Sequence, residues 1–314
     1  MTLADAAVRA AVRLERAPLG SQPSVEQVVA AIAGEERPFL LTGRWGLPET
    51  AAPQARSVVA GAGPSWQLRA GADPLLAFDD VPQIDGDVPP GAIGGGLVGW
   101  LGYDLGRSVE ATLGPQPPRP ARLPAARLAW YPDLLRRDEE GVWWVETLVP
   151  AGDAAASIEA PLARWRQRLA APTALQPATL GTMRPRHGAA THLAAIDETI
   201  ERIRAGELFQ ANVCLRLEGD LDGPAAGLAS AVLQQTDAWY GGWIDGGGGR
   251  AIVSASPELF LRRRGREVVT HPIKGTAPRA AGATDPAADP AAAALVESIK
   301  DQAEHVMIVD LMRN

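Results

Sequence analysis

An acid and an amine in the second half of the chain have the side-chain types that acid–base and nucleophilic catalysis require. Glu258 ends the run Ser-Pro-Glu at 256–258, and Lys274 lies sixteen residues later in the run Pro-Ile-Lys-Gly-Thr at 272–276. A carboxyl group can donate a proton, and an uncharged amine can attack carbon. Both residue types are also common at strand ends and turns, so the residues alone leave their role open.

A polar stretch near the end of the sequence, from Lys300 to His305, is a further candidate. Lys300 and Glu304 stand four residues apart, a spacing that places them side by side on a helix. Such a face is most often simply solvated. The alternative is that Glu304 is a ligand for Mg²⁺, which prefers carboxylate oxygens. The four histidines have no metal-ligand spacing, which disfavours zinc.

The run from Gly94 to Gly99 satisfies the pattern G-x-G-x-x-G of dinucleotide-binding loops. Such a loop needs a strand before it and a helix after it. Here two prolines precede the run at 89–90, and Gly102 and Gly106 disfavour a following helix. We therefore interpret the run as closely packed glycine-rich backbone.

A helix is expected over residues 191–206, because apolar residues recur there at helical spacing. Thr191 is the candidate N-cap, and Gly206 is the stop signal. A strand is expected from Leu208, where apolar and polar residues alternate as far as 217. Its polar face carries Gln210, and that face either contacts solvent or forms the floor of a site.

Short apolar runs predict further strands at 38–41, 142–145, 251–256 and 267–270. A hairpin is expected to join 259–263 to the last of these through a turn at Arg264-Gly265. One final helix is expected to begin near Ala291. Helix, strand and hairpin in this order favour an α+β domain over repeated βαβ units.

The pairing of this hairpin affects whether Glu258 and Lys274 can meet. If Arg263 pairs with Arg266, Glu258 faces His271 and Lys274 points to the opposite side. Prolines at 257 and 272 bend the ladder at those points. The sequence alone therefore leaves the geometry open.

The composition favours a globular protein without a nucleic-acid or membrane partner. Of the 314 residues, 46% are hydrophobic and 21% charged, and the net charge of −7 provides no basic field for nucleic acid. No segment has the roughly 18 apolar residues of a membrane span, and residues 1–20 lack the apolar core of a signal peptide. Cys214 is the single cysteine, so no intrachain disulfide can form and a cytoplasmic location is expected.

The chain is expected to contain two domains joined by a linker. Residues 1–170 form an N-terminal domain of short strands and loops, and 191–314 form a second domain that carries the candidate residues. Residues 171–190 form the linker. This linker is marked by its proline and glycine residues, Pro172, Pro177, Pro185 and Gly188.

Four collinear blocks resemble the chorismate-utilising family that includes the large subunits of anthranilate synthase and aminodeoxychorismate synthase. They lie at 95–104, 206–212, 256–276 and 300–314, and together they span most of the chain. The resemblance implies that family's fold, in which antiparallel sheets form a sandwich-like core with flanking helices. It also implies that residues 1–170 are like the N-terminal domain of anthranilate synthase component I.

Two positions resemble the aminodeoxychorismate-forming members of the family. Relatives that add water to chorismate typically have a lysine base where this chain has Gln210, so the resemblance implies ammonia as the nucleophile. Anthranilate synthases typically carry alanine at the position of Lys274. The implied reaction is the amination of chorismate to 4-amino-4-deoxychorismate, a transferase step in para-aminobenzoate and folate biosynthesis.

The resemblance also implies a role for each candidate residue. Lys274 is the covalent nucleophile at ring carbon 2, and Glu258 protonates the departing 4-hydroxyl group. Glu304 is one ligand of a Mg²⁺ ion that neutralises a chorismate carboxylate. The residues that bind or orient the substrate are Gln210, Gly275 and Thr276.

The resemblance further implies partners and an incomplete fold. Ammonia is expected from a separate glutamine amidotransferase subunit, because Cys214 does not lie in a nucleophile-elbow context. A tryptophan site near 39–41 is a further hypothesis. The sequence stops at Asn314, inside a block that continues in relatives, so we expect a fold truncated at its C-terminus, weak Mg²⁺ binding and impaired catalysis.

Two alternatives stay open at this point. An anthranilate synthase component I would release pyruvate and a fluorescent aromatic product, whereas the amination retains the enolpyruvyl group. A non-catalytic remnant would only bind the amidotransferase or tryptophan. Turnover of chorismate separates the remnant from either enzyme.

Overall fold

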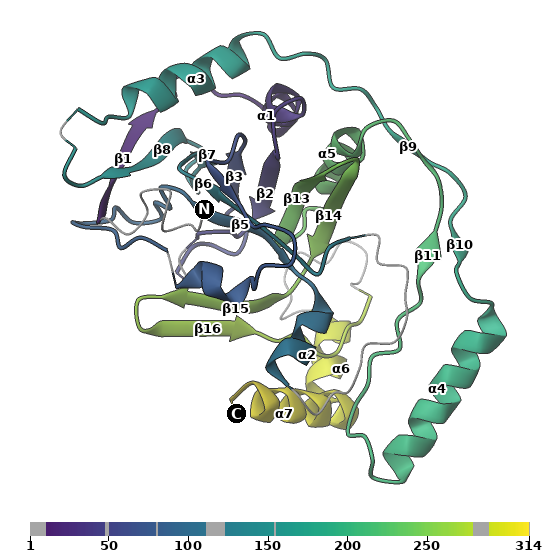
Figure 1. Ribbon diagram of the computed structural model, residues 1–314. Coiled ribbons are helices and arrows are strands. Elements are labelled where there is room, and N and C mark those ends of the chain that lie inside the picture. The colour runs from purple at the N-terminus through teal and green to yellow at the C-terminus, as the bar shows by residue number, and fades with distance from the viewer. Residues whose placement is uncertain are drawn as a thin grey trace.

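A seven-stranded antiparallel sheet forms the centre of the computed structural model, which describes residues 11–47, 50–79, 81–110, 123–153, 155–278 and 289–313. Its strands are β1 (Val12–Pro18), β2 (Phe39–Gly43), β3 (Ser57–Gly61), β7 (Asp133–Arg137), β8 (Trp143–Pro150), β13 (Tyr240–Gly247) and β14 (Arg250–Ser256). Their order is β1-β8-β7-β3-β2-β13-β14, so two strands from late in the sequence extend a sheet built by the first half (Figure 1).

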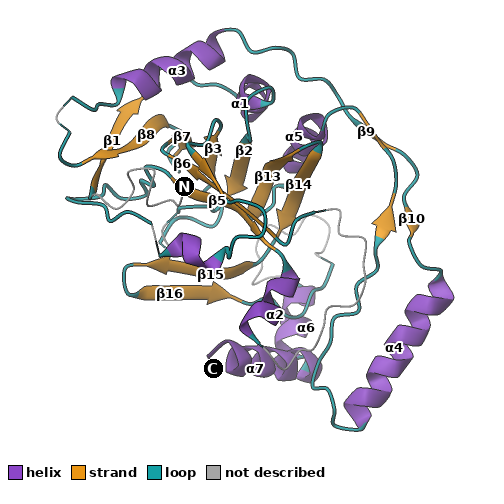
Figure 2. Ribbon diagram, viewed as in Figure 1, coloured by secondary structure: helices purple, strands orange, loops and turns teal. Residues whose placement is uncertain are grey.

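Helices cover one face of this sheet, and a second sheet covers the other. The helices are α1 (Val25–Ile32), α3 (Glu159–Ala170) and α5 (Ala225–Thr236), and the second sheet contains β4 (Trp66–Gln67), β5 (Gly96–Leu101) and β6 (Ala126–Tyr131) in the order β4-β6-β5. Figure 2 shows the three helices along the same side of the central strands. The predicted α+β class, with antiparallel sheets in a sandwich-like core and flanking helices, is confirmed.

Alternation along β2 shows why these layers form. Leu40 faces α1 and α5 in one apolar cluster, whereas Phe39 faces the second sheet and contacts the ring of Tyr131. Successive side chains on a strand point to opposite faces, so an apolar strand buries both faces between two layers. The strands expected at 38–41 and 142–145 are confirmed as β2 and β8.

A buried ion pair fixes the glycine-rich loop that leads into β5. Arg136 and Glu146 are 3% and 0% exposed, and the Arg136 Nε lies 2.6 Å from the Glu146 Oε1. The other oxygen of Glu146 accepts hydrogen bonds from the backbone N–H groups of Ile93, at 2.7 Å, and Gly94, at 2.9 Å. The charge is thus both paired and hydrogen-bonded, which is the condition for tolerating it in a core.

The remaining elements lie around or beyond this body. They are η2 (Leu75–Phe78), η3 (Tyr103–Leu105), α2 (Gly106–Val109), β9 (Thr179–Leu180), β10 (Arg184–Pro185), α4 (Ala189–Arg204), β11 (Leu217–Glu218), β12 (Leu221–Asp222), β15 (Leu259–Arg264), β16 (Glu267–His271), α6 (Pro290–Glu297) and α7 (Ile299–Arg313). In Figure 1, α4 lies at the lower right, away from the central sheet. No residue of α4, α6 or α7 is buried among those described.

The helix expected at 191–206 is confirmed as α4, but its predicted N-cap is wrong. Gly188 is the N-cap, with extended backbone, and its carbonyl accepts a hydrogen bond from the Thr191 N–H at 3.0 Å. Thr191 therefore lies inside the first turn. The predicted stop is confirmed, because Gly206 follows the helix with φ +76°, a left-handed conformation that glycine adopts without penalty.

The strand expected from Leu208 to 217 is wrong in the structure. Residues 208–216 belong to no strand, and only the pair Leu217–Glu218 forms a short ladder, with β10. An alternating pattern favours an extended chain, but a strand also needs a hydrogen-bonding neighbour. None of the described strands supplies one for 208–216.

The single final helix that was expected is also wrong, because α6 ends and α7 begins on either side of Ser298. Ser298 has extended backbone, with φ −66° and ψ 109°. Its Oγ accepts a hydrogen bond from the Asp301 N–H at 3.2 Å, so a serine that competes for backbone donors divides the helix.

The division into residues 1–170, 171–190 and 191–314 stays a prediction. Residues 240–244 of β13 pair with the whole of β2, so the region expected to form the second domain shares a sheet with the first. Within the described part of the chain, no helix is long and apolar enough to cross a membrane.

Candidate functional site

The β15–β16 hairpin positions Glu258 and the 272–276 run at its two open ends. The conditional pairing of Arg263 with Arg266 is wrong: Arg263 pairs with Val268, and Leu259 rather than Glu258 lies opposite His271. The turn is Gly265–Arg266, with Gly265 at φ +58°, as a two-residue hairpin turn with glycine first requires. A register shift between 259 and 262 is the second reason why the observed pairing differs from the expected one.

Glu258 contacts the backbone of the other motif directly. Its Oε1 accepts a hydrogen bond from the Ile273 N–H at 2.9 Å. The Ser256 hydroxyl bonds to both the N–H and the carbonyl of Glu258, each at 3.2 Å, which fixes the backbone after β14. The structure thus brings the acid to the residue that precedes Lys274, which the sequence could not establish.

Lys274 is half-buried and bonds to the same neighbour. Its Nζ donates a hydrogen bond to the Ile273 carbonyl at 2.9 Å. The acid and the amine are therefore both tied to the backbone of Ile273, one through its N–H and one through its carbonyl. This arrangement holds a carboxyl group and an amine against the same residue.

Gly275 packs against the C-terminal helices and needs to be glycine. Its φ of +72° is in the left-handed region, and a Cβ there would lie 3.1 Å from the Asp301 Cγ and 3.2 Å from a Leu295 methyl carbon. The 272–276 run is therefore in contact with the N-terminal part of α7, on which Glu304 also lies.

Glu304 is paired with Lys300 on α7, as the spacing predicted. The Lys300 Nζ lies 3.1 Å from the Glu304 Oε1, and the hydrogen bond to that carboxylate raises the pKa of Lys300. Lys300 is 78% exposed and Glu304 27%. The pair is a surface contact, which solvent screens and which contributes little to stability.

The described residues contain no cluster of three or more His, Cys, Asp or Glu side chains that could hold a metal ion by itself. Asp301 and Glu304 supply two carboxylates at i,i+3 on α7. Mg²⁺ commonly binds to one or two carboxylates and completes its shell with water and substrate oxygens. The residues present therefore fit a cation shared with an anionic substrate and do not form a site that closes around a metal.

Gln210 and Thr276 are not brought into this group of contacts. Gln210 is exposed in the unpaired segment 208–216, and Thr276 is exposed beyond Gly275. Among the contacts of the described residues, neither side chain has a hydrogen bond to Glu258 or Lys274. Their predicted roles in binding substrate remain predictions.

The glycine run from 94 to 99 is packed backbone, as interpreted from the sequence. Gly96 to Gly99 lie in β5, and a Cβ on Gly99 would stand 1.7 Å from the Arg127 carbonyl oxygen. A Cβ on Gly95 would stand 2.5 Å from the Tyr131 carbonyl oxygen. Close approach of strands, and not a phosphate, explains these glycines.

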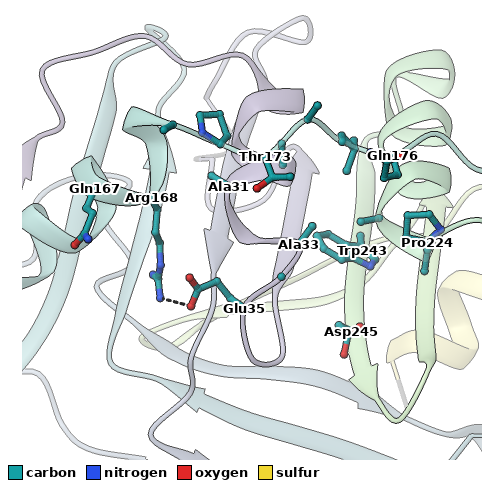
Figure 3. Close-up of a pocket in the computed structure, with 18 of the residues that line it drawn as sticks. Ala31, Ala33, Glu35, Gln167, Arg168, Thr173, Gln176, Pro224, Trp243 and Asp245 are labelled. Atoms are coloured by element: carbon teal, nitrogen blue, oxygen red, sulfur yellow. Dashed lines mark hydrogen bonds and ion pairs between the residues drawn. The ribbon is translucent and has the colours of Figure 1, made fainter.

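Two cavities of about 820 and 870 Å³ lie away from Glu258, Lys274 and Glu304. Figure 3 shows the first, between the ends of α1, α3 and α5, where Arg168 pairs with Glu35 at 3.0 Å. Trp243 forms part of its wall, but the indole is 1% exposed and its unpartnered Nε1 is buried. The lining comes from separate segments rich in alanine and proline, so no sequence motif indicated this cavity.

The stretch expected near a tryptophan site is mainly core. Phe39 and Leu40 are both 0% exposed in β2. Thr42 and Gly43 continue the strand toward Trp239, whose ring lies 5.6 Å from the Arg44 guanidinium carbon. Tryptophan binding here remains a hypothesis.

Comparison with known proteins identifies relatives of two named activities. The chain is 35% identical over 240 residues to anthranilate synthase component 1 of Thermus thermophilus, covering 73% of this chain and 48% of that protein. It is 31% identical over 244 residues to aminodeoxychorismate synthase component 1 of Salmonella typhimurium, covering 76% and 50%. The chain thus spans about half the length of the curated relatives it matches.

A solved structure shares the fold. The crystal structure of anthranilate synthase component I from Streptococcus pneumoniae matches with a TM-score of 0.66 and 21% identity, over 96% of this chain and 68% of that one. The family model described as "chorismate binding enzyme" matches residues 47–314. This chain belongs to the chorismate-binding enzyme family.

Proposed function

We propose that the protein aminates chorismate to 4-amino-4-deoxychorismate. The observation that carries the proposal is the hydrogen bond from the Ile273 N–H to Glu258, which places a carboxyl group beside the run that contains Lys274. Membership of the chorismate-binding family supplies the substrate class. Lys274 and Gln210, at the positions discussed above, favour amination over the other reactions of the family.

The side chains present can carry out the covalent steps. The uncharged Lys274 amine attacks ring carbon 2, both ring double bonds shift toward carbon 4, and the bond from carbon 4 to its hydroxyl oxygen breaks. Glu258 gives its proton to that oxygen, which leaves as water. Ammonia then attacks carbon 4, both double bonds shift back, and the carbon 2–Lys274 bond breaks to release the uncharged lysine amine. The new ammonium group on carbon 4 gives a proton to the Glu258 carboxylate, which restores the acid.

Positioning of this chemistry depends on short contacts. Because Glu258 and Lys274 are both bonded to Ile273, a ring seated against that segment can be reached by the two groups in one pose. The left-handed Gly275 turns the chain after Lys274, and the lack of a Cβ lets a substrate oxygen approach the backbone there. We assign substrate contacts to Gly275, Thr276 and Gln210.

Mg²⁺, when bound, would neutralise a chorismate carboxylate and fix its position. Glu304 would hold it, and Asp301 lies one helical turn away on the same face. Glu304 would exchange its ion pair with Lys300 for this role. Through the ion, Glu304 would orient the substrate by its carboxylate.

We also propose that ammonia is delivered by a glutamine amidotransferase partner. Two of the relatives carry the name "component 1", which supports a second component for this chain as well. Free ammonium should replace the partner in a test of the reaction itself.

The test is mass spectrometry of the products formed from chorismate, ammonium and Mg²⁺. We expect a product that retains the enolpyruvyl group. Glu258→Gln should lower kcat about 10²–10⁴-fold, the usual range for removing a general acid. Lys274→Ala should abolish the reaction, while Lys300→Ala, on the same face as Glu304, should retain it. An unchanged rate in Lys274→Ala would contradict the proposal.

A second reaction, that of anthranilate synthase component I, is favoured by one observation: the relative with 35% identity carries that name. Release of pyruvate together with a fluorescent aromatic product would establish it in place of the amination. Lys274 would then have no covalent role, and Lys274→Ala should leave that reaction measurable.

A further inference from the structure

Strand β14 is an open edge of the central sheet. It comes last in the strand order, and no other described strand pairs with its outer side. An edge strand presents unpaired N–H and C=O groups, and proteins usually protect it with proline, lysine or inward-pointing charge. The sequence of β14, Arg-Ala-Ile-Val-Ser-Ala-Ser, has one charge at its start and none of the other devices. This edge is therefore suited to accept another strand.

The segment 208–216 has a strand pattern, but only its last residue has a neighbouring strand. The Arg216 carbonyl accepts a hydrogen bond from the Arg186 N–H, next to β10, at 2.9 Å. The segment's large apolar side chains are exposed: Phe209 by 73% and Leu215 by 50%. This strand prediction, which the fold contradicts, thus lies in a segment that leaves apolar surface exposed and whose residues 209–215 have no backbone ladder with a described strand. Pairing would satisfy both.

The two faces of β14 match the two faces of the segment. Ala251 and Val253 pack toward the cluster that contains α5, whereas Ser254 and Ser256 lie on the alternate face. In the segment, Val213 and Leu215 alternate with the polar residues at 210, 212 and 214. Pairing even-numbered residues with even-numbered ones places Val213 and Leu215 beside Val253 and Ala251, and the residues at 210 and 212 beside Ser256 and Ser254. Ile252 is the one apolar residue on the second face.

The strand direction follows from a shared cavity. Arg216 and Leu221 line the 870 Å³ cavity together with Arg250 and Ala251, so the end of the segment is near the beginning of β14. A chain running back from that point along the edge is antiparallel to β14. The repulsion between Arg216 and Arg250 is reduced, because Glu218 lies 2.9 Å from the Arg216 Nε. Gly206, at φ +76°, and Gly219 flank the segment and provide the bends.

We propose that residues 208–216 dock on the free edge of β14 as an additional antiparallel strand. Docking covers the apolar side chains over the cavity beside α5. It places Gln210 on the same face as Ser256, next to the backbone that leads to Glu258. The role of Gln210 in the site rests on the proposed function, whereas the docking itself does not.

The single native cysteine allows a direct test. With Arg216 opposite Arg250, Cys214 lies opposite Ile252, and a shift of two residues places it opposite Ser254. Neighbouring residues on paired antiparallel strands have Cα atoms about 4.5–5.5 Å apart, which suits a disulfide. We would make Ile252→Cys and Ser254→Cys, oxidise each full-length variant, and count free thiols and intact mass without reductant.

Ala255→Cys is the matched control, because Ala255 is exposed like Ser254 but lies on the other face. We expect an intramolecular disulfide in Ile252→Cys or Ser254→Cys, with loss of both thiols and no dimer, and two free thiols in Ala255→Cys. Adding Cys214→Ser to the reactive variant should abolish the cross-link.

Three results would overturn the proposal: no disulfide at either position, equal oxidation of Ala255→Cys, or a product of twice the mass, which would mean pairing between two copies. Amide hydrogen exchange gives a second readout that needs no cysteine. The β14 N–H groups facing away from β13 should be protected in the native protein and lose protection in Val213→Pro. Failure of amination leaves these results unaffected, so the two proposals can be distinguished.

Discussion

Two regions of the molecule differ in how completely they bury their apolar side chains. One is the central sheet with its covering helices, and the other is the set of outer segments. Trp143, Trp165 and Trp243 are each 0–1% exposed between the sheet and its helices. Leu193 is 58% exposed on α4, although apolar residues recur at helical spacing there, and Ile299 on α7 is 83% exposed. The same kind of pattern thus leads to burial only where a second layer is present.

The difference matters for function, because the candidate site residues all lie in the outer segments or at their junction with the sheet. Glu258 and Lys274 follow β14 and β16, and Glu304 lies on α7. Their positions depend on single hydrogen bonds and on the contact of Gly275 with Asp301. We therefore expect substitutions to separate into those that unfold the body and those that alter the site with little effect on stability.

The largest contrast should come from the same substitution in the two regions. Phe39 is 0% exposed between the two sheets, and Phe260 on β15 is 77% exposed. Phe39→Ala should lower the free energy of unfolding by about 3–5 kcal/mol, through lost burial and the cavity left behind. Phe260→Ala should change it by less than about 0.5 kcal/mol.

Urea unfolding, followed by tryptophan fluorescence, measures both free energies. Equal losses in the two variants would mean that the β15–β16 hairpin is as well packed as the core, and the contrast between the regions would fail.

A smaller contrast should separate the two kinds of ion pair. Glu146→Gln removes a charge that holds Arg136 and two backbone N–H groups in the core, and it should cost about 1.5–3 kcal/mol of unfolding free energy. Arg204→Gln removes an exposed pair with Glu201, whose side chains are 70% and 69% exposed, and it should cost less than about 1 kcal/mol.

Salt dependence provides the control for this pair of variants. Added salt should reduce the contribution of the exposed pair and leave the buried one nearly unchanged. A cost for Glu146→Gln below that for Arg204→Gln would refute the assignment of Glu146 as the anchor of the 93–94 loop.

Alkaline pH should lower the free energy of unfolding through Tyr131. Burial raises the pKa of the Tyr131 phenol, while the positive charge of Arg37 opposes the shift. Because the folded state keeps the proton and the unfolded state loses it above about pH 10, this contribution is fully present below that pH and is lost as the pH rises, at up to about 1.4 kcal/mol per pH unit.

Tyr131→Phe should reduce this slope, measured as the free energy of unfolding between pH 8 and 11. The slope should not vanish, because burial also raises the pKa of Tyr240. Tyr103 is 100% exposed, so Tyr103→Phe is the matched control and should leave the slope as it is. An unaltered slope in Tyr131→Phe would contradict the assigned cause.

Several elements, in the central sheet and in the outer segments, could be predicted from local patterns. The runs at 38–41 and 142–145 are both in strands of the central sheet, and their successive side chains point into two apolar layers. The hairpin after Glu258 was indicated by its glycine turn, and α4 by its apolar spacing. These elements are determined within a few residues of sequence, where backbone preferences and side-chain alternation act together.

The rest depends on contacts that no local pattern specifies. The observed hairpin register differs from the expected one, because the turn has two residues and a bulge leaves Glu258 outside the ladder. Residues 208–216 have a strand pattern, but pairing requires a partner in space. Glu258 was indicated by its motif, whereas its bond to Ile273 depends on how two proline-bounded segments bend. The resemblance identified the candidate residues, and only the three-dimensional structure shows which of them lie together.

The smallest predicted effects concern the N-caps of one helix in each region. In α1, Ser24 accepts a hydrogen bond from the Gln27 N–H at 3.1 Å, and the Gln27 side chain accepts one from the Ser24 N–H at 2.7 Å. Ser24→Ala removes this capping box and should cost about 1 kcal/mol. Since α1 packs on the core through Ile32, the loss should appear in the global unfolding free energy.

Helix α4 starts at Gly188 without a side-chain cap, so Gly188→Ser should add one and stabilise the helix by a few tenths of a kcal/mol. Because α4 has no buried residue, this gain should appear as slower amide exchange in its first turn, with the global unfolding midpoint unchanged. A rise in the global midpoint would show that α4 unfolds together with the sheet. The contrast between a cooperative body and independently opening outer segments would then have to be replaced by a single cooperative unit.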